Sequence, residues 1–423
     1  MIDQEFPPSL ESIGKKKNLS WKCFNDFPLF VEQSSQFPKQ GKLGNCYWIA
    51  PLVSVYAAKP QQIKSLFESH NNEFTSVRFC IDGEWQLITV DHHFPFNEDK
   101  QKVAYSKLVD GAIWAMILEK AWAKLYGSYQ QINAGFNRTT FKVLTGAPTN
   151  KFRVKDPNFK EIFYEIGDLR FPVGANSKKQ QEDNIFATNH AYSVLKIQED
   201  QIVVRNPWGL KNRDQHILTL EEFKKRFASI ECCYHFDGYQ YQGEKVTSVI
   251  LEPVYFEIEI KAPGNYFFTI NQKNKRWFRN KPHLKYVISP CQIEMIYGDT
   301  IMNQQHHKSN KELWINWNFS KPCKIYIICK VEWQNIEVNE FIFNTYGPEF
   351  SQKRVMEIIK NNEDFNNLGS IQFVQRDSEK EQEEEEKQIQ NTNVNFEQVD
   401  QIQRVPSPPH QKERKSCGQC SIY

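Results

Sequence analysis

Long apolar segments are absent from this sequence. Its 423 residues contain no run of about 18 apolar side chains, and the first residues lack the basic region and apolar stretch of a secretory signal. These absences argue against a membrane span and against secretion. A cytoplasmic protein is therefore expected, and the C-terminus leaves membrane association open.

An excess of charge of either sign is also absent. The chain has 53 Lys and Arg residues against 51 Asp and Glu, which leaves a formal net charge of +2. Proteins that bind nucleic acid usually carry a clear basic excess, so no nucleic-acid partner is predicted. The ten cysteines lack the dense spacing of a disulfide-rich secreted domain, and most are expected to be reduced thiols.

Patterns typical of metal sites are scarce. No D-x-[DN]-x-[DN]-G calcium loop occurs, and no two C-x-x-C pairs stand at zinc-ribbon spacing. Adjacent histidines occur at His92 and His93 and at His306 and His307. Because neighbours on a strand face opposite sides, we interpret both pairs as surface or turn residues. The metal ligands, if any, are unknown from the sequence.

Changes of pattern along the chain predict several units of mixed α+β structure. A length of 423 residues suggests about three domains at roughly 150 residues each. The predicted units are an N-terminal segment (1–20), a helix-rich lobe (21–136), a strand-rich lobe (137–253), a β-sandwich (254–373) and a disordered tail (374–423). The tail is assigned from its loss of apolar residues, which leaves too little surface to bury.

Local patterns predict where helices and hairpins lie. Apolar runs of good helix formers indicate helices over 46–58 and 112–125. Strand-like runs around polar turns indicate hairpins over 77–90 and 191–205. The thiol of Cys46 is thereby placed where a glycine-containing loop enters a helix. Backbone N–H groups and the helix dipole favour thiolate there, so its pKa is expected to fall below the usual value of about 8.5.

Other polar residues are expected beside this thiol. His190 opens a predicted strand and Asn206 ends the next one, so antiparallel pairing brings them close. The Asn206 side-chain oxygen is then able to fix the imidazole tautomer, and His190 to act as acid and base. Gln40 is a candidate oxyanion donor together with the Cys46 backbone N–H, and Trp208 a cover that excludes water.

Several motifs resemble the protease core of the calpain family, and they occur in the calpain order. They are QGKLGNCYW at 40–48, LEKAWAKLYGSY at 118–129, HAY at 190–192 and RNPWG at 205–209. The resemblance spans roughly residues 21 to 240. Any one motif is weak by itself, but their order makes chance a poor explanation.

This resemblance implies a papain-like, two-lobed cysteine protease acting on the peptide bonds of protein substrates. Cys46 is implied as nucleophile, His190 as acid and base, Asn206 as the orienting residue and Gln40 as oxyanion donor. The β-rich block after residue 254 is similar, less specifically, to the C2-like sandwich that follows the calpain core. The chemistry requires no cofactor.

The sequence departs from the calpain pattern at several points. Asn45 stands where the family has Asp, and Pro51 lies in the second turn of the nucleophile helix, where it removes an N–H and is expected to kink the helix. The acidic calcium ligands implied by the resemblance are missing over 34–39 and largely missing over 210–214. Calcium control through the core is therefore not expected, and calcium is left as a candidate regulator acting on the sandwich. The 118–129 motif is interpreted as core packing.

An alternative reading makes the chain a catalytically weak or inactive calpain-like adaptor that binds protein or lipid. Pro51 and the missing acidic ligands keep this alternative open. Membrane association is a further hypothesis, through the β-sandwich or through lipidation of Cys417 and Cys420 in a loose C-a-a-X context. An acidic run at 379–387 is interpreted as a solvated segment without assigned function.

Overall fold

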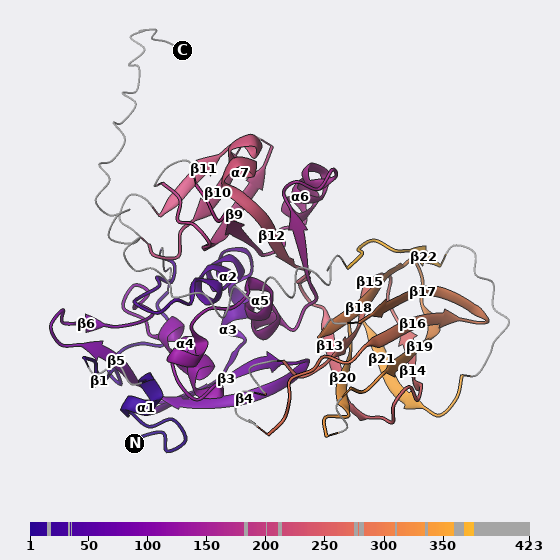
Figure 1. The fold of residues 1–423 in the computed structure, drawn as a ribbon, viewed down its shortest axis with the longest axis horizontal. Helices are drawn as coiled ribbons and strands as arrows, with labels where there is room; N and C mark the ends of the chain where they lie inside the picture. The colour runs from indigo at the N-terminus through magenta and orange to yellow at the C-terminus, as the bar shows by residue number, and fades with distance from the viewer. Residues whose placement is uncertain are drawn as a thin grey trace, which may run out of the picture.

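The structure is a computed structural model of the chain (Figure 1). It describes residues 1–375 apart from 15–17, 33, 35, 182–184, 200, 210–213, 275–277, 279–282, 309–310, 335–336 and 359–367. The acidic run, Cys417 and Cys420 lie outside the described residues, as does the predicted tail beyond Gln375. In the described part, no helix has the length and apolar character needed to cross a bilayer.

The N-terminal part combines helices with two three-stranded antiparallel sheets, ordered β1-β5-β6 and β2-β3-β4. Its elements are α1 (Leu10–Ile13), β1 (Ser20–Cys23), α2 (Cys46–Ala58), α3 (Pro60–Lys64), β2 (Phe67–His70), β3 (Phe74–Ile81), β4 (Glu84–Asp91), β5 (His93–Asn97), β6 (Lys102–Val103), α4 (Trp114–Leu125), the 3-10 helix η1 (Gln130–Ile132) and α5 (Asn137–Thr145). The helix predicted over 46–58 and the hairpin over 77–90 are confirmed. The helix predicted from 112 begins later, at Trp114, because Ala112 closes a tight turn by pairing with Val109.

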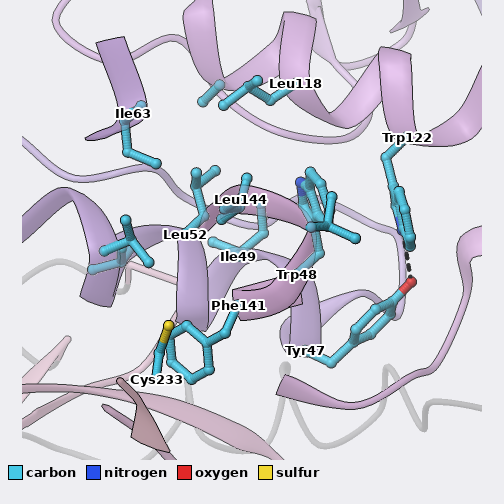
Figure 2. Close-up of a cluster of buried hydrophobic side chains, with 14 of the residues drawn as sticks. Tyr47, Trp48, Ile49, Leu52, Ile63, Leu118, Trp122, Phe141, Leu144 and Cys233 are labelled. Atoms are coloured by element: carbon cyan, nitrogen blue, oxygen red, sulfur yellow. Dashed lines mark hydrogen bonds between the residues drawn. The ribbon is translucent and has the colours of Figure 1, made fainter. Parts of the chain in front are cut away.

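Helix α2 lies at the centre of this part. Every residue from Tyr47 to Val55 is buried, which explains why the helix is apolar on all sides. One side contacts α5 and another contacts β8 and β9 of the next sheet. Trp48 stacks on Trp122 of α4, with ring centroids 4.9 Å apart. The Trp122 indole N–H donates to the Tyr47 hydroxyl over 3.1 Å (Figure 2).

A six-stranded antiparallel sheet follows, in the order β11-β10-β9-β8-β12-β7. Its elements are β7 (Thr149–Arg153), α6 (Phe159–Asp168), β8 (Val173–Ser177), β9 (Ala191–Gln198), β10 (Gln201–Arg205), β11 (Gln215–Leu218), α7 (Leu220–Arg226) and β12 (Phe227–Cys233). The predicted hairpin over 191–205 is confirmed as β9 and β10, in which Arg205 pairs with Ser193.

The C-terminal part contains two five-stranded antiparallel sheets, ordered β13-β20-β15-β18-β22 and β17-β16-β19-β14-β21, drawn from red to yellow in Figure 1. Its strands are β13 (Gln240–Thr247), β14 (Val254–Ile260), β15 (Gly264–Asn271), β16 (Cys291–Tyr297), β17 (Thr300–His307), β18 (Glu312–Phe319), β19 (Cys323–Val331), β20 (Glu340–Gly347), β21 (Phe350–Val355) and β22 (Gly369–Ser370). Side chains from both sheets form a second hydrophobic core. Strand β16 buries every second residue, as expected for a strand with one face on such a core.

The C-terminal sheets are attached to both preceding parts. The tip of the β3–β4 hairpin inserts among them, where the Gly83 carbonyl accepts hydrogen bonds from the Tyr241 hydroxyl (2.6 Å) and the Asn344 amide (2.9 Å). Gly83 has a φ of +89°, and a Cβ there would lie 2.6 Å from Asn344 Oδ1, so only glycine fits this turn. Elsewhere Phe373 stacks on Tyr234, with centroids 4.5 Å apart. The three parts therefore share buried contacts.

Candidate active site

The loop before α2 positions the thiol of Cys46. Gly41 packs so closely against the backbone that a Cβ would lie 2.2 Å from the Tyr105 carbonyl oxygen. The next residue, Lys42, donates its backbone N–H to the Ala104 carbonyl over 2.9 Å. Cys46 is then the first residue of α2, with Asn45 as the N-cap, as the sequence predicts.

A buried glutamate side chain holds the turn that precedes Cys46. Glu119 of α4 is 1% exposed, and its Oε1 accepts from the Asn45 amide over 2.7 Å. Its Oε2 accepts from the Ser106 backbone N–H over 2.9 Å. Burial raises the pKa of Glu119, against the lowering effect of these hydrogen bonds. Glu119 thus links α4, the loop at 106 and the residue before the nucleophile.

His190 and Asn206 meet as the hairpin pairing predicts. Their side chains lie with imidazole Nε2 3.0 Å from the amide Oδ1, and both residues are buried. Because an amide oxygen only accepts, Nε2 carries the proton and Nδ1 keeps its lone pair. Asn206 Oδ1 also accepts from the Trp208 backbone N–H over 3.1 Å. The Trp208 ring lies 4.5 Å from the imidazole centroid and covers it, as expected.

Gln40 lies in the same region, but its amide is partly engaged. Its Nε2 donates to the Leu43 carbonyl over 2.6 Å, which leaves the second amide N–H for another acceptor. Its Oε1 is buried and has no hydrogen-bond partner in the described part of the chain. The backbone N–H of Gln40 donates to the Pro207 carbonyl over 2.8 Å, next to Asn206.

The thiol and the imidazole are both neutral at pH 7 in this arrangement. Burial raises the pKa of Cys46, and backbone N–H groups, including that of Ala191, offset only part of the rise. Burial likewise lowers the pKa of His190 to about 4, against a smaller opposing effect of Asn206. Among the described residues no hydrogen bond joins the Cys46 thiol to the His190 ring.

The expected fall in the Cys46 pKa is therefore wrong for this structure. The N–H groups at the helix N-terminus do favour thiolate, as argued from the sequence, and the Ala191 N–H adds to them. Desolvation outweighs them because the thiol is buried. The thiol lies within reach of the backbone N–H of Ala191, the residue after His190.

Pro51 does not end α2, and the expected kink stays a prediction. The helix runs from Cys46 through Pro51 to Ala58. The carbonyl of Tyr47, which loses its usual N–H partner, accepts from the Thr140 hydroxyl of α5 over 2.7 Å. A side chain from a neighbouring helix thus replaces the missing backbone donor one residue after the nucleophile.

Thr140→Val is expected to lower the free energy of unfolding by about 1–3 kcal/mol, because it leaves the Tyr47 carbonyl buried and unpaired. In a Pro51→Ala background the loss is expected to shrink below about 1 kcal/mol, since the restored backbone N–H takes this carbonyl. Urea unfolding of the wild type, both single variants and the double variant measures the difference. An equal loss in both backgrounds contradicts the compensation.

The histidine pairs differ from each other. His92 is fully buried in the bend between β4 and β5, so the surface assignment is wrong while the turn assignment fits: Nε2 bonds the Thr75 hydroxyl over 2.9 Å, and the ring stacks on His70. His306 is exposed, and His307 half-buried, on strand β17. In the described ranges no group of three or more His, Cys, Asp or Glu side chains is gathered as a metal site.

Three residues escaped the sequence reasoning. Glu119 and Thr140 act through contacts with residues far along the chain, and Arg205 had been read only as part of a motif. The available signals were a glutamate inside an apolar helical run and an arginine directly before Asn206. Neither signal names a partner.

A model of the calpain family cysteine proteases matches residues 1–215. The chain belongs to the calpain family of cysteine proteases. The matched residues of this calpain-family chain include Gln40, Cys46, His190 and Asn206. The C-terminal sheets lie beyond them.

The relatives of this calpain-family chain come from plants and animals. Calpain-type cysteine protease ADL1 of Oryza sativa subsp. japonica is 29% identical over 246 residues, covering 49% of this chain and 11% of that protein. Calpain-14 of Homo sapiens is 28% identical over 238 residues, covering 49% and 34%. The calpain-2 catalytic subunit of Bos taurus is 26% identical over 250 residues, covering 49% and 35%. The match thus spans between about a tenth and about a third of these relatives.

Likeness to solved structures is weak. The cysteine protease and lectin-like domains of Cwp84, from Clostridium difficile, give a TM-score of 0.24 at 9% identity, covering 74% of this chain and 76% of that one. Cwp84 after propeptide cleavage gives a TM-score of 0.19 at 9% identity, covering 47% and 58%.

Proposed function

We propose that this calpain-family chain is an endopeptidase that makes limited cuts in intracellular proteins. Cys46 is the nucleophile, His190 the acid and base, Asn206 the orienting residue and Gln40 an oxyanion donor. The observation that carries the proposal is the 3.0 Å contact between Asn206 Oδ1 and His190 Nε2. It fixes the tautomer whose Nδ1 lone pair is able to accept the proton of a thiol.

The reaction follows from these groups. Nδ1 of His190 takes the thiol proton as the Cys46 sulfur attacks the carbonyl carbon of the scissile peptide bond. The carbonyl oxygen becomes an oxyanion, which the Cys46 backbone N–H and the free Gln40 amide N–H stabilise. The tetrahedral intermediate collapses as the imidazolium gives its proton to the leaving amine. Water, deprotonated by His190, then hydrolyses the acyl thioester and restores the thiol.

Because the thiol and the imidazole are neutral at rest, the alignment of the Cys46 sulfur with His190 Nδ1 is the step that controls the rate of cleavage. Proton transfer needs the sulfur to leave the Ala191 N–H and meet Nδ1 of His190, and a bound substrate is proposed to favour that contact. Once formed, the thiolate and imidazolium stabilise each other in a site that Trp208 shields from water.

The proposed frame is a papain-like pair of lobes over 21–136 and 137–253, followed by a C2-like sandwich over 254–373. The support is that α2, which begins at Cys46, contacts β8 and β9, and that β9 begins directly after His190. The last described residue, Gln375, still contacts the C-terminal sheets: its amide donates to the Glu312 carbonyl over 2.8 Å. A cytoplasmic location, with membrane attachment through the sandwich or a lipidated C-terminus, stays a prediction.

Labelling with an epoxysuccinyl thiol-reactive inhibitor tests the proposal, with and without calcium. The purified chain is expected to incorporate the label at Cys46 and to cleave an unfolded protein substrate. Cys46→Ala is expected to lose both. The readouts are the labelled peptide by mass spectrometry and the cleavage products on a gel.

Calcium separates two forms of the proposal. Labelling that needs calcium makes it the signal that aligns the site, and labelling without calcium indicates alignment by substrate alone. An intact, folded chain that neither labels nor cleaves in either condition contradicts the enzyme and favours the adaptor.

A further inference from the structure

Arg205 is a buried cation directly before Asn206. Arg205 is the last residue of β10, and its side chain is 1% exposed. Removing a guanidinium from water is unfavourable unless its N–H groups are satisfied. A methionine of similar length would fill the space without that penalty, so packing alone does not explain the charge.

The guanidinium is held between two separate segments. Its Nε donates to Asp214 Oδ2 over 3.3 Å, on the side where β11 begins. Its Nη1 donates to the Pro38 carbonyl over 3.0 Å, and its Cζ lies 5.4 Å from the Phe37 ring centroid. The planar fork of arginine reaches both oxygens at once, which a lysine ammonium does not.

These contacts belong to a longer seam between residues 37–40 and 205–209. Beyond the Arg205 contact, a Cβ on Gly209 would lie 2.5 Å from Lys39 Cγ, so the two segments are in close contact there. Next to it, the Gln40 backbone N–H donates to the Pro207 carbonyl over 2.8 Å. One side of the seam carries Gln40 and the other carries Asn206.

We infer that Arg205 is a positioning residue that holds the Gln40 amide in register with the His190–Asn206 pair. Asp214 fixes the guanidinium from one side, and the guanidinium fixes the Pro38 carbonyl on the other. Pro38 lies two residues before Gln40, so a shift of this carbonyl displaces the oxyanion donor. This inference rests on the proposed function and adds a residue to its machinery.

The test is a double-mutant cycle between Arg205→Lys and Gln40→Ala. Arg205→Lys is expected to lower kcat for peptide hydrolysis about tenfold with KM changed less than twofold, because Gln40 acts on the transition state. In the Gln40→Ala background the same change is expected to lower kcat less than twofold. Alkylation of Cys46 by iodoacetamide needs no oxyanion donor, so its rate and pH profile are expected to stay unchanged.

Controls separate positioning from folding. Arg153→Lys alters a surface arginine whose Nε lies 3.3 Å from Asp156, and it is expected to leave kcat unchanged. If Arg205→Lys does not fold, Asp214→Ala takes its place, with an expected loss of a few-fold that also disappears in the Gln40→Ala background. Asp214 is 32% exposed, so this change removes little buried surface.

Each outcome decides the inference. A loss of equal size with and without Gln40 overturns it, as does an alkylation rate that falls in parallel with kcat. A wild-type chain that cleaves no substrate removes the proposed function and the inference with it. Active wild type with an additive cycle removes the inference alone.

Discussion

His190→Ala is expected to lower kcat by about 10²–10⁴-fold, the usual contribution of a positioned acid and base. In the wild type, kcat/KM is expected to rise with pH through about 4, the pKa to which burial lowers His190, because the imidazole must be unprotonated to accept the thiol proton. The variant is expected to lose this acid limb. Initial rates of peptide hydrolysis between about pH 3.5 and 8 measure both effects.

His92→Gln is the matched control for this change. Burial lowers the pKa of His92 to about 4 as well, but its ring bonds Thr75 and stacks on His70, away from the candidate site. Its kcat and acid limb are expected to match the wild type at temperatures where both are folded. An acid limb that persists in His190→Ala would assign the limb to another group.

Lys120→Met is expected to lower the free energy of unfolding by about 3–5 kcal/mol. Lys120 and Asp91 are both 0% exposed, and their charged atoms lie 2.5 Å apart. The ammonium also donates to the His93 carbonyl over 2.8 Å and lies 5.4 Å from the Trp21 ring centroid. Removing it leaves the buried Asp91 carboxylate with the His93 ring at 3.1 Å and the backbone N–H groups of Asp3 and His93 as its described partners. Urea unfolding measures the loss, and Tm is expected to fall on the order of 10 °C.

A surface ion pair supplies the comparison. Arg153 is 48% exposed and its partner Asp156 is 20% exposed, so Arg153→Met is expected to change stability by less than about 1 kcal/mol. The contrast tests burial as the cause. A loss below about 1 kcal/mol for Lys120→Met would mean that water reaches Asp91 or that the carboxyl becomes protonated.

The sequence predicted the parts of the site that depend on local order. A glycine-containing loop entering an apolar run placed Cys46 at the start of α2, and two strand-like runs placed His190 beside Asn206. These features depend on patterns within about twenty residues, where periodicity and pairing geometry are informative. Local reasoning could not name Thr140 as the donor that compensates for Pro51, nor the burial of His92, which is set by elements that pack over it.

The order of the motifs, the elements that carry them and membership of the calpain family were thus determined by the sequence itself. The neutral state of Cys46 and His190 was decided by the tertiary structure, because burial between α2 and β9 outweighs the Ala191 N–H and the Asn206 amide, which favour the charged forms. The same holds for the contacts of Glu119 and Arg205. Each has a partner far along the chain, Asn45 for Glu119 and Pro38 for Arg205. A pattern in sequence fixes which groups are present but not which of them lose water together.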